Sequence, residues 1–226
     1  PDFVCGHSLG EYTALVASGV ITLKEAVHLV HIRGQLMQTA VPEGEGGMAA
    51  LLGLSDDLVA EACKEASQGE VVSPANFNSP GQVVISGAAD ALERAIILAK
   101  EKGAKRAAKL PVSVPCHCDL LKPAGDALAR EMNKIKFNVP ILPVMQNVNA
   151  GLPKDVDDLK KNLLSHLYSP VLWSQSITAL TKLDANVFIE CGPGKVLSGL
   201  NKRIDKSVRS FAMSDLESMS LVAEAL

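Results

Sequence analysis

The sequence lacks any long hydrophobic run. Its most apolar stretches, such as Ala91–Ala99, are short and interrupted by charged residues, which excludes a membrane-spanning segment. It also lacks an excess of basic residues, because 22 Lys and Arg are balanced by 25 Asp and Glu, for a net charge of −3. We therefore expect neither a membrane nor nucleic acid among its partners.

Cysteine is scarce, and its spacing forms no recognisable framework. The five cysteines are an odd number and contain no repeated C-x-x-C motif, which argues against a set of disulfides. They are typical of reduced thiols, so we expect a cytoplasmic protein. Cys116-His117-Cys118 resembles a group of metal ligands, but neighbouring residues cannot all face one ion, so no metal site is expected.

The composition is that of an ordinary globular protein. Apolar residues make up 47% and charged residues 21% of the 226 positions, which excludes disorder, collagen-like repeats and coiled coil. A chain of this length buries roughly 70% of its unfolded surface and needs no disulfide or metal to fold. The first methionine is Met37 and the chain opens on Pro1, so we expect a fragment or a processed chain.

The predicted elements divide the chain into an α/β core and an insert. Residues 47–113 predict strands and helices in the order βαββαβ, the plan of a ferredoxin-like unit. Residues 1–46 and 114–226 alternate strands with helices, the pattern of a parallel sheet covered on both faces. The strands of the insert are expected at Met48–Gly53, Val71–Asn76, Gln82–Ser86 and Lys105–Ser113, with a turn at Asn78–Gly81.

Gly6-His7-Ser8-Leu9-Gly10 matches the motif G-x-S-x-G between a predicted strand and a predicted helix. In this context the serine is a nucleophile on a sharp, strained turn, and the flanking glycines let strand and helix approach closely. The start of the helix favours developing negative charge, and the amide of Leu9 is the natural oxyanion donor. The alternative interpretation is a purely structural turn.

A nucleophilic serine needs a base, and the histidines are the candidates. His7 points away from Ser8 on such a turn, and His28 and His31 fall on the polar face of the second predicted helix. His117 follows a strand and a proline-containing turn, where sheet proteins place working residues. His117 is the leading candidate for the base, and a packing histidine is the alternative.

Arg33 lies at the centre of an apolar stripe on the second predicted helix. At 100° per residue the other members of this stripe are Ala26, Leu29, Val30, Leu36, Met37 and Ala40. A guanidinium facing the core must find an anion or several carbonyls. Two interpretations are open: a structural salt bridge with a carboxylate of the chain, or a bidentate clamp for a substrate carboxylate beside Ser8.

Several motifs in order along the chain give a family resemblance. They are Gly6-His7-Ser8-Leu9-Gly10-Glu11-Tyr12, Arg33-Gly34 with Met37, Asn76-Phe77-Asn78-Ser79-Pro80-Gly81-Gln82, Pro111–Cys118 and Gly192-Pro193-Gly194-Lys195-Val196-Leu197. Together they resemble the malonyl-CoA:acyl-carrier-protein transacylases, an acyltransferase family of fatty-acid and polyketide synthesis. The resemblance implies an α/β-hydrolase-like core with an inserted ferredoxin-like subdomain, and it implies that the first strand and the N-terminal loop of the family are missing.

The resemblance also implies roles for individual residues. Ser8 is the expected nucleophile, His117 the base without an acidic third member, and Arg33 the residue that holds the malonyl carboxylate. Leu9 supplies one oxyanion amide, whereas the family's second donor belongs to the missing loop. The resemblance thus interprets Arg33 as part of the site.

Three further positions follow from the resemblance alone. Met37, Asn78 and His166 are expected among the substrate-binding residues. In the family a backbone carbonyl, usually that of a glutamine, orients the catalytic histidine. His166 occupies the matching position, and a main-chain contact can survive that substitution.

The implied activity is ping-pong transfer of a malonyl group from malonyl-CoA to the pantetheine thiol of acyl carrier protein. No cofactor is expected, the partners are malonyl-CoA and acyl carrier protein, and the protein is expected to be a monomer. Two alternatives remain open at this point: a serine thioesterase or other α/β-hydrolase, which has no use for Arg33, and an inactive fragment.

Overall fold

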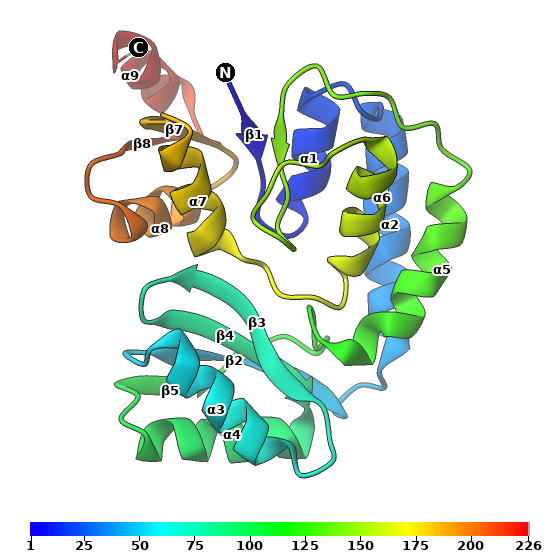
Figure 1. Cartoon of the computed structure of the whole chain (residues 1–226), viewed down its shortest axis with the longest axis vertical. Helices are drawn as coiled ribbons and strands as arrows, with labels where there is room; N and C mark the ends of the chain where they lie inside the picture. Colours follow the sequence, from blue (N-terminus) through cyan, green and yellow to red (C-terminus); the bar gives the residue numbers. More distant parts are fainter. Residues whose placement is uncertain (226) are drawn as a thin grey trace.

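The computed structural model describes residues 1–225 as an α/β fold with mixed sheets. In Figure 1 the colours follow the chain from the N-terminus to the C-terminus. The antiparallel sheet lies at one end of the molecule and most of the helices lie at the other. Within residues 1–225, no helix has both the length and the apolar character needed to cross a membrane.

The first elements form the turn that carries the G-x-S-x-G motif. Strand β1 (Val4–Cys5) leads into helix α1 (Gly10–Ala17), and helix α2 (Leu23–Ala40) follows. A capping box fixes the start of α2, because the Thr22 side chain accepts from the Glu25 amide while the Glu25 carboxylate accepts from the Thr22 amide at 2.7 Å. This cap and the apolar stripe together direct one face of α2 into the core.

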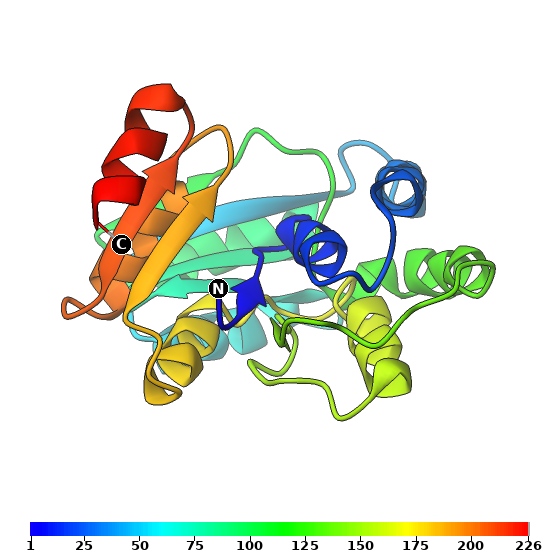
Figure 2. The same ribbon diagram turned by 90° about the horizontal axis from the view of Figure 1, so that it is seen from above.

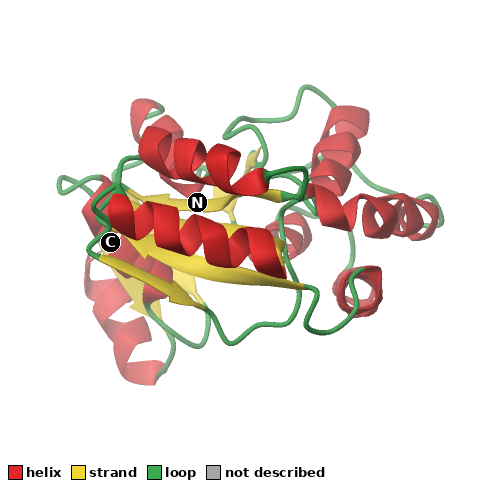
Figure 3. Cartoon of the chain, turned by 90° about the horizontal axis from the view of Figure 1, so that it is seen from below, coloured by secondary structure: helices red, strands yellow, loops and turns green. Residues whose placement is uncertain are grey.

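The middle of the chain builds an antiparallel sheet with two helices on one face. Its elements are β2 (Gly46–Leu52), α3 (Asp56–Ser67), β3 (Val72–Ser79), β4 (Gln82–Ala88), α4 (Ala89–Glu101) and β5 (Arg106–Lys109). The strand order is β3-β4-β2-β5, and all three ladders are antiparallel. Helices α3 and α4 lie side by side over the sheet (Figure 3). Their buried side chains join those of the sheet in one apolar cluster.

Two boundaries of this sheet differ from the prediction by three residues or more. Strand β3 runs on to Ser79 and pairs with Gln82, so only Pro80-Gly81 remain for the turn, not Asn78–Gly81. Proline followed by a residue with positive φ, here Gly81 at 71°, is the signature of a type II turn. Strand β5 ends at Lys109 and not at Ser113, because Pro111 has no amide to donate to a ladder.

The remaining elements pack against α1 and α2 or surround the C-terminal β7–β8 ladder. They are the 3₁₀ turn η1 (Asp119–Leu121), α5 (Lys122–Met132), β6 (Val144–Met145), α6 (Val156–Ser165), α7 (Trp173–Lys182), β7 (Val187–Cys191), α8 (Val196–Ile204), β8 (Arg209–Met213) and α9 (Leu216–Ala225). Residues of α1, α2, α5 and α6 share a second apolar cluster. Backbone bonds between Val171 and β3 join the antiparallel sheet to this part.

The parallel strands are organised differently from the single sheet that the sequence predicts. Strand β1 pairs with β6, β7 pairs with β8, and both ladders are parallel. Within residues 1–225 these two ladders are separate sheets, and Figure 2 shows β7 and β8 apart from β1. Strands β1 and β6 pair over only two residues each, because the turn at Gly6 follows β1 at once.

Candidate active site

Ser8 lies on a strained turn between β1 and α1. Its φ of 52° falls in the left-handed region, which is unfavourable for a residue with a side chain. Gly6 makes the turn possible, since a Cβ there would lie 2.0 Å from the carbonyl carbon of Gly10. Gly10 itself has open space around it, so the expectation that both glycines are needed for close approach is correct for Gly6 alone.

The hydroxyl of Ser8 faces His117. The distance from Ser8 Oγ to His117 Nε2 is 2.8 Å. His117 Nδ1 lies 2.8 Å from the carbonyl oxygen of His166, and a carbonyl can only accept, so Nδ1 carries the hydrogen. The neutral ring therefore presents the lone pair of Nε2 to the serine, which is the state a general base requires.

Main-chain groups hold His117 in place. Its own amide donates to the carbonyl of Leu167 at 3.1 Å, and its ring donates to the carbonyl of His166. Helix α6 ends at Ser165, and His166 follows it directly. The last carbonyls of a helix have no partner within it and are free to accept from elsewhere.

Burial keeps His117 neutral. Its side chain is buried, and burial, followed by the positive charge of Arg33, lowers its pKa to about 3. The hydrogen bond to the His166 carbonyl opposes this shift. The ring therefore remains unprotonated throughout the neutral pH range.

Arg33 reaches the same serine from α2. Its guanidinium Nη2 donates to Ser8 Oγ at 3.1 Å, and its Nε is buried without a hydrogen-bond partner among residues 1–225. The guanidinium also lies over the Tyr12 ring, 5.9 Å from its centroid. No carboxylate of the described chain is within ion-pair distance of Arg33, although it is only 6% exposed. The salt-bridge interpretation is therefore wrong, and the site holds a buried cation with free donors.

Asn147 is a site residue that the sequence did not reveal. Its Oδ1 accepts from the Ser8 amide at 2.9 Å, and its Nδ2 donates to the Gly6 carbonyl at 2.7 Å. The side chain thus clamps both ends of the strained turn. It lies two residues after the end of β6, and the rule that functional residues follow the carboxyl ends of parallel strands is the signal that could have found it.

The other predicted residues surround this centre. His7 points away from Ser8, as expected, and its Nε2 donates to Asn78 Oδ1 at 2.8 Å. The ring of His166 is buried and stacks on the ring of His117. Met37 packs in the apolar cluster one turn beyond Arg33, so its contact with substrate stays a prediction, as does that of Asn78.

Leu9 is the N-cap residue that precedes α1, and its side chain is exposed. Its amide donates no hydrogen bond to the described part of the chain. This amide follows the nucleophile and belongs to the first turn of the helix, where backbone N–H groups are free. It is therefore available to stabilise an oxyanion, which is the role that the motif predicts.

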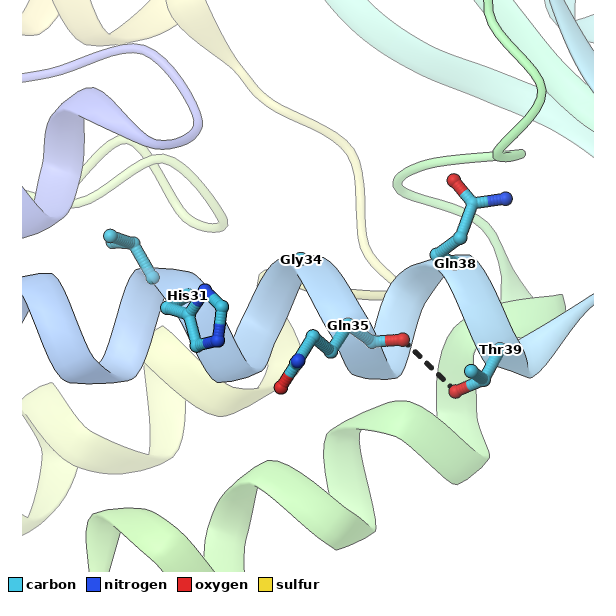
Figure 4. A pocket seen from close by; sticks show the side chains of 6 residues that line it. His31, Gly34, Gln35, Gln38 and Thr39 are labelled. Atoms are coloured by element: carbon cyan, nitrogen blue, oxygen red, sulfur yellow. Dashed lines mark hydrogen bonds between the residues drawn. The ribbon is translucent and has the colours of Figure 1, made fainter.

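A separate hollow of about 710 Å³ runs along the outer face of α2. Its lining residues are Val30, His31, Gly34, Gln35, Gln38 and Thr39. Figure 4 shows these side chains along the helix, with the Thr39 hydroxyl bonded to the carbonyl of Gln35. The helix turns Arg33 and Met37 inward, away from this exposed face. The hollow therefore does not belong to the serine site.

The thiols of the two cysteines beside His117 are directed at backbone carbonyls. Cys116 Sγ lies 3.5 Å from the Val114 carbonyl, and Cys118 Sγ lies 3.3 Å from the Pro115 carbonyl. Within residues 1–225 no group of three or more His, Cys, Asp or Glu side chains is arranged to hold a metal.

A serine on a strained turn, a neutral histidine and a buried cation form a site that can make and break an acyl-serine ester. Comparison with known proteins agrees with this class: the sequence profile of the acyl transferase domain matches residues 1–224. The chain belongs to the acyl transferase domain family and, within it, to the malonyl CoA-acyl carrier protein transacylases.

The similarity to individual relatives extends over nearly the whole chain. The malonyl CoA-acyl carrier protein transacylase of Escherichia coli K12 is 50% identical over 224 residues, covering 99% of this chain and 72% of the relative. The Bacillus subtilis protein of the same name is 45% identical, covering 100% of this chain and 72% of its own.

Solved structures give the same result. The crystal structure of an acyl carrier protein S-malonyltransferase from Vibrio cholerae is 53% identical with a TM-score of 0.97, over 98% of this chain and 72% of that one. A malonyl-transacylase in complex with a type II polyketide synthase acyl-carrier protein is 46% identical with a TM-score of 0.98, over 100% of this chain and 73% of that one.

Proposed function

We propose that this chain transfers a malonyl group from malonyl-CoA to the pantetheine thiol of acyl carrier protein, which supplies the extender unit for fatty-acid synthesis. The observation that carries the substrate choice is Arg33, a buried guanidinium that bonds the nucleophile and has no carboxylate partner within the described chain. A free carboxylate on the acyl group is the partner this cation lacks. The proposal requires no metal or resident cofactor.

In the first half of the reaction Ser8 attacks malonyl-CoA. His117 Nε2 takes the hydroxyl proton while Oγ bonds to the thioester carbonyl carbon, and the Leu9 amide stabilises the oxyanion. When the carbon–sulfur bond breaks, the imidazolium returns its proton to the leaving thiolate. Free CoA and a malonyl-Ser8 ester result.

In the second half the carrier protein's thiol attacks that ester. His117 now takes the proton of the thiol, and after collapse of the tetrahedral intermediate it protonates Ser8 again. Arg33 keeps the malonyl carboxylate in place between the two halves. The same base thus serves twice, which is the form of a ping-pong mechanism.

The proposal extends to positions around the centre and to the organisation of the chain. Met37, Asn78 and His166 are proposed to shape the acyl site. Residues 1–46 and 114–226 are proposed as an α/β-hydrolase-like core, with residues 47–113 as a ferredoxin-like subdomain. The strand order β3-β4-β2-β5 supports the second assignment. A cytoplasmic, monomeric protein is part of the same proposal.

Mass spectrometry after incubation with malonyl-CoA tests the proposal. We expect a malonyl adduct on the peptide that contains Ser8, and its transfer to acyl carrier protein when that partner is added. Ser8→Ala is the matched control and should carry no adduct. Release of free malonate without transfer would instead favour a thioesterase, and a wild-type chain without any adduct would refute the proposal.

A further inference from the structure

Glu11 is a buried carboxylate that the proposed reaction does not use. It lies on α1, three residues after Ser8, and it is 1% exposed. Its Oε2 accepts from the Asn147 amide at 3.0 Å, and its Oε1 lies 3.3 Å from Gln146 Nε2. Burying an ionised carboxylate costs free energy unless an opposite charge and hydrogen bonds compensate it. Both of these donors are neutral.

His166 connects this carboxylate to the catalytic base. Its Nδ1 lies 3.5 Å from Glu11 Oε2, and its ring stacks on that of His117, with centroids 4.9 Å apart and planes inclined by 25°. Neither ring nitrogen of His166 has a hydrogen-bond partner within residues 1–225. Glu11, His166, His117 and Ser8 therefore form one unbroken series of contacts.

The reaction creates a charge that this series can stabilise. His117 becomes an imidazolium each time it accepts a proton, while Arg33 repels that charge. The His166 carbonyl offers only a dipole. Once a substrate carboxylate pairs with Arg33, a negative charge on Glu11 is left to balance the imidazolium, and the field of a charge acts strongly in a buried site.

We propose that Glu11 is the acidic positioning residue of this site: it holds the His166 ring against His117, and its negative charge stabilises the imidazolium in both halves of the transfer. The inference rests on the proposed function, because it assumes that His117 is the base. Glu11 does not touch His117 and acts on it through the stacked ring of His166.

The groups around Glu11 determine at which pH this charge is present. The titratable groups that interact with it are Cys5, Tyr12, Arg33 and His166, and the rings of His7 and His117 interact in turn with that of His166. Burial lowers the pKa values of the three histidines and raises those of Cys5 and Tyr12 to about 12, so these groups are neutral near pH 7. Arg33 is the only one that is charged.

Burial also raises the pKa of Glu11 to about 7, against the opposing effects of the Asn147 amide, Gln146 and Arg33. Above about pH 7 the carboxylate is ionised and assists His117. Below it the carboxyl is neutral and the assistance is lost. Because the pKa of His117 is about 3, a fall in rate near pH 7 reports Glu11 and not the base.

The pH dependence of CoA release from malonyl-CoA in the first turnover tests this inference, measured from about pH 5 to about pH 9. We expect the wild-type rate constant to fall below about pH 7. Glu11→Gln, which keeps the shape and one acceptor, should remove this fall and be about tenfold slower at alkaline pH, the equivalent of one pKa unit on His117. Glu43→Gln, at an exposed glutamate, is the control and should match the wild type.

His166→Phe provides an independent measurement. It keeps an aromatic ring against His117 but removes the polar nitrogen that lies 3.5 Å from Glu11 Oε2, so the surroundings of the carboxylate become less polar, its pKa rises and the fall in rate should move to higher pH. This variant decides the matter if Glu11→Gln does not fold. A fall in rate that stays at the same pH in His166→Phe would contradict the inference.

The outcomes separate the inference from the proposed function. A wild-type chain that releases no CoA at any pH overturns the proposed function, and the inference with it. An active wild type whose pH profile is unchanged in Glu11→Gln overturns the inference alone. A uniformly slower Glu11→Gln with a lower thermal midpoint and an unchanged profile would likewise leave Glu11 as a structural residue only.

Discussion

Replacing Arg33 with alanine removes two interactions that can be measured apart. One is the bond from Nη2 to Ser8 Oγ at 3.1 Å, which is the same for every acyl substrate. The other is the proposed bond to the substrate carboxylate, for which the buried and unpartnered Nε is available. Acetyl-CoA has no carboxylate, so it experiences only the first loss, whereas malonyl-CoA experiences both.

The size of the second loss follows from the kind of bond. A charge-assisted hydrogen bond contributes about 1.5–3 kcal/mol, which corresponds to roughly 10- to 100-fold in rate, and a bidentate pair contributes somewhat more. The ratio of malonyl to acetyl transfer in Arg33→Ala should therefore fall by that factor. Arg33→Lys should restore only part of it, because an ammonium cannot reproduce the planar fork.

The assay compares kcat/KM for malonyl-CoA and acetyl-CoA, together with the thermal midpoint of each variant. Removing an unpaired buried charge should not lower the midpoint by much. Arg94→Ala is the matched control, because Arg94 does pair with a carboxylate, that of Glu70, and its loss should leave the substrate ratio unchanged. Equal losses for both substrates with a lowered midpoint in Arg33→Ala would refute the role in substrate binding.

Three further outcomes are expected. Gly6→Ala should destabilise the fold by about 1–3 kcal/mol or more by overpacking, whereas Gly10→Ala, where space is open, should change the unfolding free energy by less than about 1 kcal/mol; equal midpoints would contradict this. Asn147→Ala leaves the Ser8 amide without its acceptor, at a cost of about 1–3 kcal/mol in denaturant unfolding, and CoA release should slow. Because the pKa of His117 is about 3 when folded, the unfolded chain alone takes up this proton near pH 6.5. As the pH is lowered below about 6.5, the thermal midpoint of the wild type should therefore decrease. It should decrease less steeply in His117→Gln.

The sequence predicted the parts of the site that short-range patterns encode. The turn at Ser8 follows from the spacing of Gly6 and from the change of strand to helix. The inward direction of Arg33 follows from helical periodicity alone. Each of these patterns acts over a few residues, so it can be read without knowing the tertiary structure.

The parts that the sequence did not reveal depend on contacts between distant segments. Asn147 and Glu11 are hydrogen-bonded although they lie 136 residues apart in the sequence. No local sequence pattern predicts that contact. The partner of His117 is a backbone carbonyl, which any residue at position 166 supplies. The division of the parallel strands into two ladders depends on which backbones come within hydrogen-bond distance, and periodicity carries no information about that.

The distances along the chain between the site residues have a consequence for folding. Ser8 and His117 are 109 residues apart, and Ser8 and Asn147 are 139 apart, with the whole β3-β4-β2-β5 sheet between Ser8 and His117. Closing loops of this length costs conformational entropy before the contacts at their ends can stabilise the chain. Contacts between residues far apart in the sequence therefore slow folding. The antiparallel sheet and the α1–α2 pair can form from nearer contacts first. During refolding, the ability to release CoA should therefore recover later than the secondary structure. Activity then reports the last step of folding, in which the distant segments of the site come together.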